Sequence, residues 1–238
     1  MENATYTAIT RQSGLMNEMR VVANNLANIS TTGYRGEGVI FAEHVTALGP
    51  DDPSLSMATA AARETLNAQG ALSQTGGAFD LAIEGEGFFL IETPNGERLS
   101  RAGAFTPNEN GDLVTPEGFR VLDAGGAPVF IPQGAGPVGI APDGTVSAGG
   151  QPVGQVGLVI PLNAMGMVRE DGVRFRADDG HEPALTGRML QGFLEDSNVD
   201  PVLEVSRMIE VQRAYELGQS FLDKEDERIR SALRALGK

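Results

Sequence analysis

Two stretches of mostly apolar residues at helical spacing, one near each end of the chain, constrain the fold more than any other feature. The first has intervals of four, three, four and three residues and consists of Leu15, Met19, Val22, Leu26 and Ile29. The second consists of Val202, Val205, Ile209, Gln212, Leu217, Phe221 and Leu222. A repeat averaging about 3.5 residues is typical of a helix that packs along its length against another helix. The sequence therefore predicts that the two terminal helices pair, within one chain or between chains.

Between the two helices the apolar period changes to two. Phe79, Leu81 and Ile83 alternate with more polar or smaller residues, which is the pattern of a half-buried strand. Tight-turn dipeptides follow at short intervals, including Asn95-Gly96 and Asp143-Gly144. Asn-Gly and Asp-Gly supply the positive φ angles that hairpins need. We therefore expect an antiparallel β domain over residues 72–190.

Helix-stop and helix-start signals mark the ends of this middle region. The run Ser30-Thr31-Thr32-Gly33 ends the first helix, because hydroxyl groups compete for the backbone and Gly33 can adopt positive φ. Asp200 is suited to cap the second helix, and Pro201 fits its first turn. Gly14 and Gly218 are weak points inside the helices, since glycine costs about 1 kcal/mol relative to alanine there.

The predicted fold class is α+β, with the N- and C-terminal helices pairing as an α-helical coiled coil and a central antiparallel β domain between them in the sequence. Residues 36–71 show no clean apolar stripe, and their Ala-rich part could be helical or irregular. We interpret them as a connector with little structure of its own. The predicted segments are an N-terminal helix in residues 1–35, the connector in 36–71, the β domain in 72–190 and a C-terminal helix in 195–238.

The charge of the chain excludes some classes of partner. Lys and Arg total 18 against 32 Asp and Glu, which gives a net charge of −14. Nucleic acids and anionic lipids need a basic face, so neither is expected as a partner. No segment approaches the roughly 18 apolar residues of a membrane span, and no basic and apolar leader of a cleaved secretory signal opens the sequence. The absence of cysteine excludes disulfides and zinc–thiolate sites.

The residues that could take part in catalysis or metal binding do not form a recognisable catalytic pattern. Glu84 and Glu86 would share one face of a strand and could serve acid–base chemistry or bind a hard cation, but they also fit two acids beside a Gly-rich turn. His44 and His181 stand outside any metal-ligand spacing and are better interpreted as surface residues. We predict no catalytic, metal or cofactor site and no enzyme activity. The alternative is an enzyme or carbohydrate-binding module built on the β domain around the two glutamates.

Asparagines distinguish the first helix. Asn24, Asn25 and Asn28 are poor helix formers on a helix whose other face is apolar. They indicate contacts with a neighbouring chain, although solvated side chains would also fit. The predicted subunit-interface residues are Leu15, Met19, Val22, Asn24, Asn25, Leu26, Asn28, Ile29, Val202, Val205, Ile209, Gln212 and Tyr215.

Three blocks of sequence resemble the bacterial flagellar rod and hook family. The N-terminal block is Val22-Ala23-Asn24-Asn25-Leu26-Ala27-Asn28-Ile29-Ser30-Thr31-Thr32-Gly33-Tyr34-Arg35. The C-terminal block comprises Ser197-Asn198-Val199-Asp200-Pro201-Val202-Leu203-Glu204 and Met208-Ile209-Glu210-Val211-Gln212-Arg213-Ala214-Tyr215-Glu216. The middle block comprises Phe79–Phe89, Ser100–Phe105 and Gly111–Phe119. The opening residues and the modest length are most similar to the proximal rod members, with distal rod and hook subunits as alternatives.

The resemblance implies a structural subunit of the basal-body rod. Its terminal helices would form the inner coiled-coil wall of a hollow helical assembly, with the β domain outside. Its partners would be other rod subunits, further copies of itself and the flagellar type III export apparatus. Its location would be the periplasmic rod, reached without a cleaved signal peptide, and no cofactor is implied.

Overall fold

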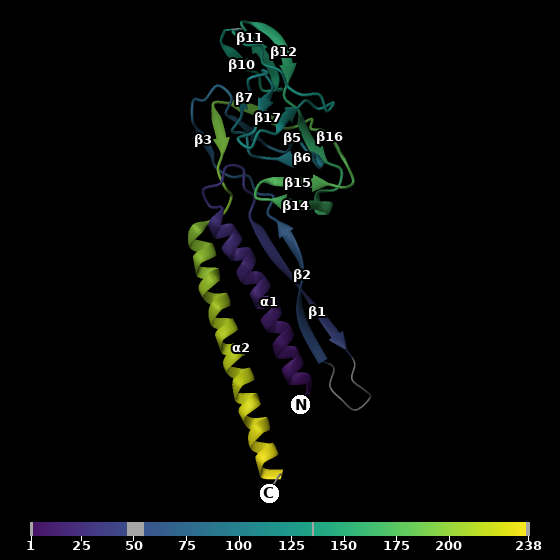
Figure 1. Ribbon diagram of the computed structural model, residues 1–238, viewed down its shortest axis with the longest axis vertical. Coiled ribbons are helices and arrows are strands. Elements are labelled where there is room, and N and C mark those ends of the chain that lie inside the picture. Colours follow the sequence, from purple (N-terminus) through teal and green to yellow (C-terminus); the bar gives the residue numbers. More distant parts are fainter. Residues whose placement is uncertain (1, 47–54, 135, 237–238) are drawn as a thin grey trace. The chain divides into compact units, whose positions relative to one another are not determined.

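The computed structural model describes residues 2–46, 55–134 and 136–236. The chain divides into two compact units (Figure 1). The helical unit consists of Met1–Ala27, Gly36–Leu66 and Val199–Lys238, and the β unit consists of Asn28–Arg35 and Asn67–Asn198. The fold class is α+β, with one long helix near each end of the chain and antiparallel sheets between them.

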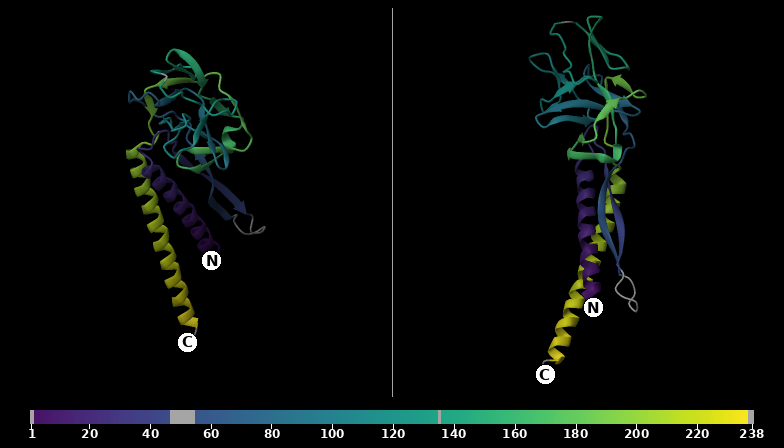
Figure 2. Two further views of the ribbon diagram at one scale, coloured as in Figure 1. Left: turned by 45° about the horizontal axis from the view of Figure 1, so that its top comes forward. Right: turned by 90° about the vertical axis from the view of Figure 1, so that its right-hand side faces the viewer.

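Two long helices and one β-hairpin make up the helical unit. Helices α1 (Glu2–Ala27) and α2 (Pro201–Leu236) lie side by side and run antiparallel, as both views of Figure 2 show. Strands β1 (Glu37–Thr46) and β2 (Leu55–Thr65) pair antiparallel, and both contact α1. The helical unit is therefore a three-part assembly in which α1 contacts α2 and the hairpin.

The hairpin corrects the interpretation of residues 36–71 as a connector with little structure. Strand β1 is rich in the β-branched and aromatic residues that favour extended backbone, among them Val39 and Ile40. Strand β2 is rich in alanine and has weak strand propensity, but it pairs with β1 from Glu37↔Thr65 to Thr46↔Leu55. Pairing with a distant strand thus determines the secondary structure of a segment whose local sequence is ambiguous. Residues 47–54, between the strands, lie outside the described residues.

The predicted ends of the helices are largely confirmed. The Asp200 Oδ1 accepts hydrogen bonds from the backbone N–H groups of Val202 at 2.8 Å and Leu203 at 3.2 Å, so Asp200 caps α2. Helix α1 ends at Ala27, two residues earlier than the apolar stripe indicates. Gly33 has a φ of +68°, and a Cβ there would lie 2.3 Å from the backbone N of Ala102, so only glycine fits.

The β unit contains the antiparallel strands that the alternating pattern predicts. Its strands are β3 (Leu72–Gln74), β4 (Leu81–Glu84), β5 (Phe88–Thr93), β6 (Gly96–Ser100), β7 (Thr106–Pro107), β8 (Leu113–Val114), β9 (Arg120–Leu122), β10 (Val138–Ile140), β11 (Thr145–Ala148), β12 (Gln151–Gln155), β13 (Leu158–Pro161), β14 (Met167–Asp171), β15 (Arg174–Ala177), β16 (His181–Pro183), β17 (Arg188–Gln191) and β18 (Phe193–Glu195). The main sheet has the path β14-β15-β6-β5-β9-β8-β7, with β13 joining β5 to β16. Smaller sheets pair β10-β11-β12, β17-β4 and β18-β3.

Strand β5 separates two apolar clusters. Phe89 and Ile91 belong to the larger cluster, whereas Leu90 belongs to the smaller cluster with Phe175. Successive side chains of a strand point to opposite faces, so β5 is buried on both sides. This arrangement explains why Phe88–Ile91 forms a continuous apolar run instead of an alternating one.

Candidate subunit interface

Helices α1 and α2 meet along a seam of polar and small residues. Gln12 of α1 donates from Nε2 to the Tyr215 carbonyl at 2.9 Å, and Arg207 of α2 donates from Nε to Glu18 Oε1 at 2.9 Å. At Gly218 the helices approach so closely that a Cβ would lie 2.8 Å from Gln12 Nε2. Gly218, predicted as a weak point of the helix, is therefore the residue that permits this contact.

Asn25 joins three elements of the helical unit. Its Nδ2 donates to the Glu37 carbonyl at 2.8 Å, and its Oδ1 accepts from the Glu37 N–H at 2.9 Å. The same Nδ2 lies 3.2 Å from Glu204 Oε1 on α2. Asn25 is only 1% exposed, so its interpretation as a contact to a neighbouring chain is corrected. The amide side chain satisfies a strand backbone and holds α1, β1 and α2 in one register.

The other predicted residues of the N-terminal stripe differ in accessibility. Val22 is 1% exposed and belongs to the interior of its own unit. Residues of intermediate burial are Leu15, Met19, Leu26, Asn28 and Ile29. Asn24 is exposed. The stripe is thus covered in part by the rest of the chain and keeps partly accessible apolar surface.

The first half of the predicted α2 stripe does not face α1, whereas Leu217 and Phe221 of its second half line a groove between the two helices and Leu222 is half-buried. Val202, Val205 and Ile209 are 72%, 46% and 44% exposed, and Gln212 is also exposed. With about 100° of rotation per residue, Val202 and Ile209 lie about 180° and about 160° around the helix from the buried Val211. The described residues of the chain thus leave this face of α2, consisting of Val202, Val205 and Ile209, largely accessible.

The residues of α2 that do face α1 were missed by the sequence analysis. They include Glu204, Arg207, Val211, Ala214 and Gly218, which recur at intervals of three, four, three and four. Most of these residues are charged or small, so a search for apolar periodicity does not reveal this face of the helix. Tyr215, one of the predicted interface residues, contacts α1 through its backbone carbonyl, which accepts the hydrogen bond from Gln12.

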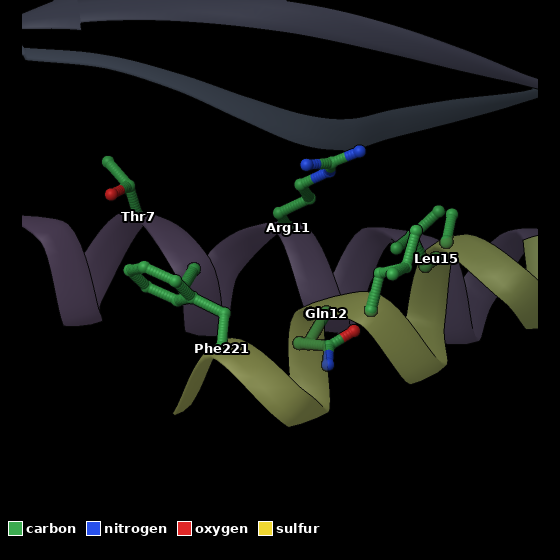
Figure 3. A pocket seen from close by; sticks show the side chains of 9 residues that line it. Thr7, Arg11, Gln12, Leu15 and Phe221 are labelled. Atoms are coloured by element: carbon green, nitrogen blue, oxygen red, sulfur yellow. The ribbon is translucent and has the colours of Figure 1, made fainter. Parts of the chain in front are cut away.

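A groove of about 570 Å³ lies between the two helices. Its lining residues are Thr7, Ala8, Arg11, Gln12, Leu15, Ala214, Leu217, Gly218 and Phe221. Figure 3 shows Gln12 and Phe221 between the helix ribbons, with Arg11 pointing away from α2. Leu217 and Phe221 are 73% and 43% exposed, so the groove adds a second accessible apolar surface to the helical unit.

The residues considered for chemistry remain separate in the structure. Arg188 on β17 forms an ion pair with Glu84, and its hydrogen bond lowers the pKa of the Glu84 carboxyl below its usual value. His181 Nε2 lies 3.0 Å from Glu97 Oε2, whereas the side chain of His44 lies outside the described residues. Within the described ranges, no three His, Asp or Glu residues converge on a metal position. The described helices also include none that is long and apolar enough to span a membrane.

Comparisons with known families cover both terminal helices and the β unit. A family described as flagella basal body rod protein matches residues 6–35. The flagellar hook protein FlgE/F/G D1 domain matches residues 82–148, and the flagellar basal body rod FlgEFG protein C-terminal region matches residues 190–235. The three matches follow the same order as the three blocks that carry the sequence resemblance.

Full-length relatives give the same result. The flagellar basal-body rod protein FlgF of Caulobacter vibrioides is 40% identical over 245 residues, which cover 100% of this chain and 99% of the relative. FlgF of Mesorhizobium japonicum is 37% identical over 241 residues, with 100% and 99% coverage. The flagellar basal-body rod protein FlgG of Bacillus subtilis is 31% identical over 254 residues, with 95% and 96% coverage.

Proposed function

The chain belongs to the flagellar basal-body rod protein family and is a structural subunit of the rod, and from this premise we propose that its terminal helices carry the contacts between subunits. The helices of neighbouring subunits pair as a coiled coil and form the inner wall of a hollow helical assembly. Residues 72–190 form an outer β domain, and residues 1–35 and 195–238 supply the rod helices. This subunit has no enzymatic role.

The exposed apolar face of α2 carries this proposal. Val202, Val205 and Ile209 lie away from the buried Val211 and remain 72%, 46% and 44% exposed among the described residues. Burying each such side chain stabilises an interface by about 1.5–3 kcal/mol before the cost of ordering is subtracted. The remaining accessible interface residues are Leu15, Met19, Asn24, Leu26, Asn28, Ile29 and Gln212. A helical filament needs head-to-tail contacts, so the face of one subunit meets a different surface of the next.

The proposed position is the proximal rod. The FlgF relatives from Caulobacter vibrioides and Mesorhizobium japonicum are 40% and 37% identical, compared with 31% for FlgG of Bacillus subtilis. The family also contains FlgG and hook proteins, so a distal rod or hook position is the second candidate. Imaging of basal bodies from a strain that lacks the protein tests the position, since the rod should stop near its base.

The proposed route to this position is export through the flagellar type III apparatus without signal cleavage, followed by assembly in the periplasm. The partners are further copies of this chain and other rod subunits. An intact N-terminus on the protein recovered from purified basal bodies supports this route. A processed N-terminus contradicts it.

The substitution Ile209→Asp tests the interface. The charge should prevent burial of the α2 face, so cells should lose complete rods and motility while the purified monomer keeps its circular dichroism spectrum. Leu185→Asp is the matched control, because Leu185 is 94% exposed on the β unit and the substitution adds the same charge. Complete rods and normal motility with Ile209→Asp contradict the proposed interface.

A further inference from the structure

A buried group of three charges lies in the β unit. Arg35 Nη2 is 3.0 Å from Glu195 Oε1, and Arg101 Nε is 3.6 Å from Glu195 Oε2. The three side chains are only 3%, 4% and 1% exposed for Arg35, Arg101 and Glu195. Two buried guanidinium groups thus share one carboxylate, which leaves an excess of one positive charge in a chain whose net charge is −14.

The hydrogen bonds of this group are incomplete. Arg35 donates from Nη1 to the Asn67 carbonyl at 2.7 Å, and Arg101 donates from Nη2 to the Gly85 carbonyl at 2.7 Å. Arg101 Nη1 and Arg35 Nε are buried without a hydrogen-bond partner among the described residues, and Arg101 Nε faces Glu195 Oε2 beyond hydrogen-bond distance. Burial lowers the pKa of Arg101 to about 10, against the opposing effect of Glu195. A buried cation with open donors is costly, so the site favours an additional anion.

A pocket of about 390 Å³ adjoins both arginines. Its apolar wall includes Phe88, Ile160 and Met167, and the Arg101 guanidinium lies 5.5 Å from the Phe88 ring centroid. Glu86 also lines the pocket and is exposed. The pocket therefore combines two guanidinium groups with an apolar wall, which suits a small group that has a negative head and an apolar stem.

We propose that this pocket binds a single carboxylate, held by Arg101 together with Arg35. Arginine presents paired N–H donors in a fork that matches the two oxygens of a carboxylate. The carboxylate comes either from an Asp or Glu side chain of a second copy of this chain or from a free anion. Glu86 opposes the ligand as a like charge at the same pocket. The site is independent of the helical interface, because all of its residues belong to the β unit.

Titration of the full-length protein with sodium acetate tests the site, with sodium chloride at equal ionic strength as the reference. The Nε–Hε NMR signal of Arg101, assigned with Arg101→Lys, should shift saturably with a dissociation constant on the order of 1–10 mM. An equal shift of the Arg101 signal in chloride overturns the proposal. The absence of a saturable shift in acetate also overturns it, unless the Arg101 signal already shifts with protein concentration.

Two variants that each remove one negative charge test whether acetate binds in this pocket. Glu86→Gln should tighten acetate binding about two- to fivefold, the scale of one exposed charge interaction. Glu84→Gln removes the same charge two residues away but lies outside the pocket lining, so its affinity should match that of the unsubstituted protein. Equal tightening in both variants would show a general charge effect and would overturn binding in this pocket.

Dilution of the protein distinguishes the two possible sources of the carboxylate. If a second copy supplies it, the Arg101 signal shifts with protein concentration in chloride, and acetate reverses the concentration dependence. If the source is a free anion, the acetate shift is the same at every protein concentration. Either result supports a carboxylate site, whereas a signal insensitive to both acetate and protein concentration overturns it.

Discussion

The β unit and the helical unit differ in how completely they bury their apolar side chains. In the β unit, side chains such as Leu81, Phe89 and Phe175 are 0% exposed and pack in two clusters. In the helical unit, the buried apolar side chains among the described residues are Val21, Val22, Val199 and Val211. Eleven large apolar side chains among its described residues remain exposed: Ile9, Ile40, Leu66, Val202, Leu203, Val205, Ile209, Leu217, Phe221, Ile229 and Leu233. The β unit builds its core within one chain, whereas the helical unit keeps exposed apolar surface, which fits the proposed interface.

The largest effect should come from Phe89→Ala in the β unit. Phe89 is fully buried and meets Phe105 edge-to-face at a centroid distance of 5.1 Å, so the substitution should lower the free energy of unfolding by about 3–5 kcal/mol. Hydrogen exchange of β-unit amides measures this loss. Leu217→Ala is the counterpart in the helical unit and should cost less than about 0.5 kcal/mol in the monomer, because Leu217 is 73% exposed. Similar losses in both variants would refute the contrast.

The next effect concerns the polar contacts that hold the helical unit together. Asn25→Ala leaves the buried N–H and carbonyl of Glu37 without their amide partner, which should cost about 1–3 kcal/mol. Faster exchange of the Glu37 amide reports the loss locally. Asn24→Ala, at the exposed neighbouring position, should change stability by less than about 0.5 kcal/mol. Unchanged Glu37 protection in Asn25→Ala would contradict the role of this side chain.

The spacing of apolar residues along the sequence predicts the elements whose structure follows from local pattern. The 3.6-residue and two-residue periods identify both helices and the antiparallel β unit, because each element buries one side against the rest of the fold. The same reasoning fails for the β1–β2 hairpin. The alanines of β2 have no strand preference of their own, and the pairing with β1 across residues 47–54 supplies the missing stabilisation.

The sequence predicts which residues of α2 form an apolar stripe, but not which side of the helix meets α1. An apolar stripe shows that a helix has a partner, yet it does not show whether that partner belongs to the same chain. In α2, the exposed face carries Val202 and Ile209, whereas Arg207 and Gly218 meet α1. Asn25 is a poor helix former, which indicates a polar contact, but its partners Glu37 and Glu204 are 12 and 179 residues away, so local spacing does not identify them.

Gly218 sharpens the distinction between the two faces of α2. Gly218→Val should cost about 1–3 kcal/mol in the helical unit, because the added atoms meet the Gln12 side chain where α1 and α2 cross. Ser220→Val introduces the same β-branched residue at an exposed position and should cost no more than about 0.5 kcal/mol. Hydrogen exchange along α1 and α2 measures both variants. Equal costs would show that the close approach of Gly218 to Gln12 does not determine the effect.

The smallest effect on stability should come from a surface carboxylate of the β unit, Glu170. Glu170 accepts hydrogen bonds from Arg98 and Arg176, and the bond from Arg98 is the main cause of its lowered pKa. The unfolded chain therefore binds the proton more tightly than the folded chain. The stabilisation is present above the ordinary glutamate pKa of about 4.3 and is lost as the pH falls through the lower pKa of the folded state.

Glu170→Gln should flatten this acid dependence of stability, measured as the urea midpoint between about pH 5 and pH 3. Glu182→Gln removes the same charge from β16 and should leave a steeper acid dependence than Glu170→Gln. If the two variants have the same pH profile, the Arg98–Glu170 pair does not contribute to the acid stability of the β unit.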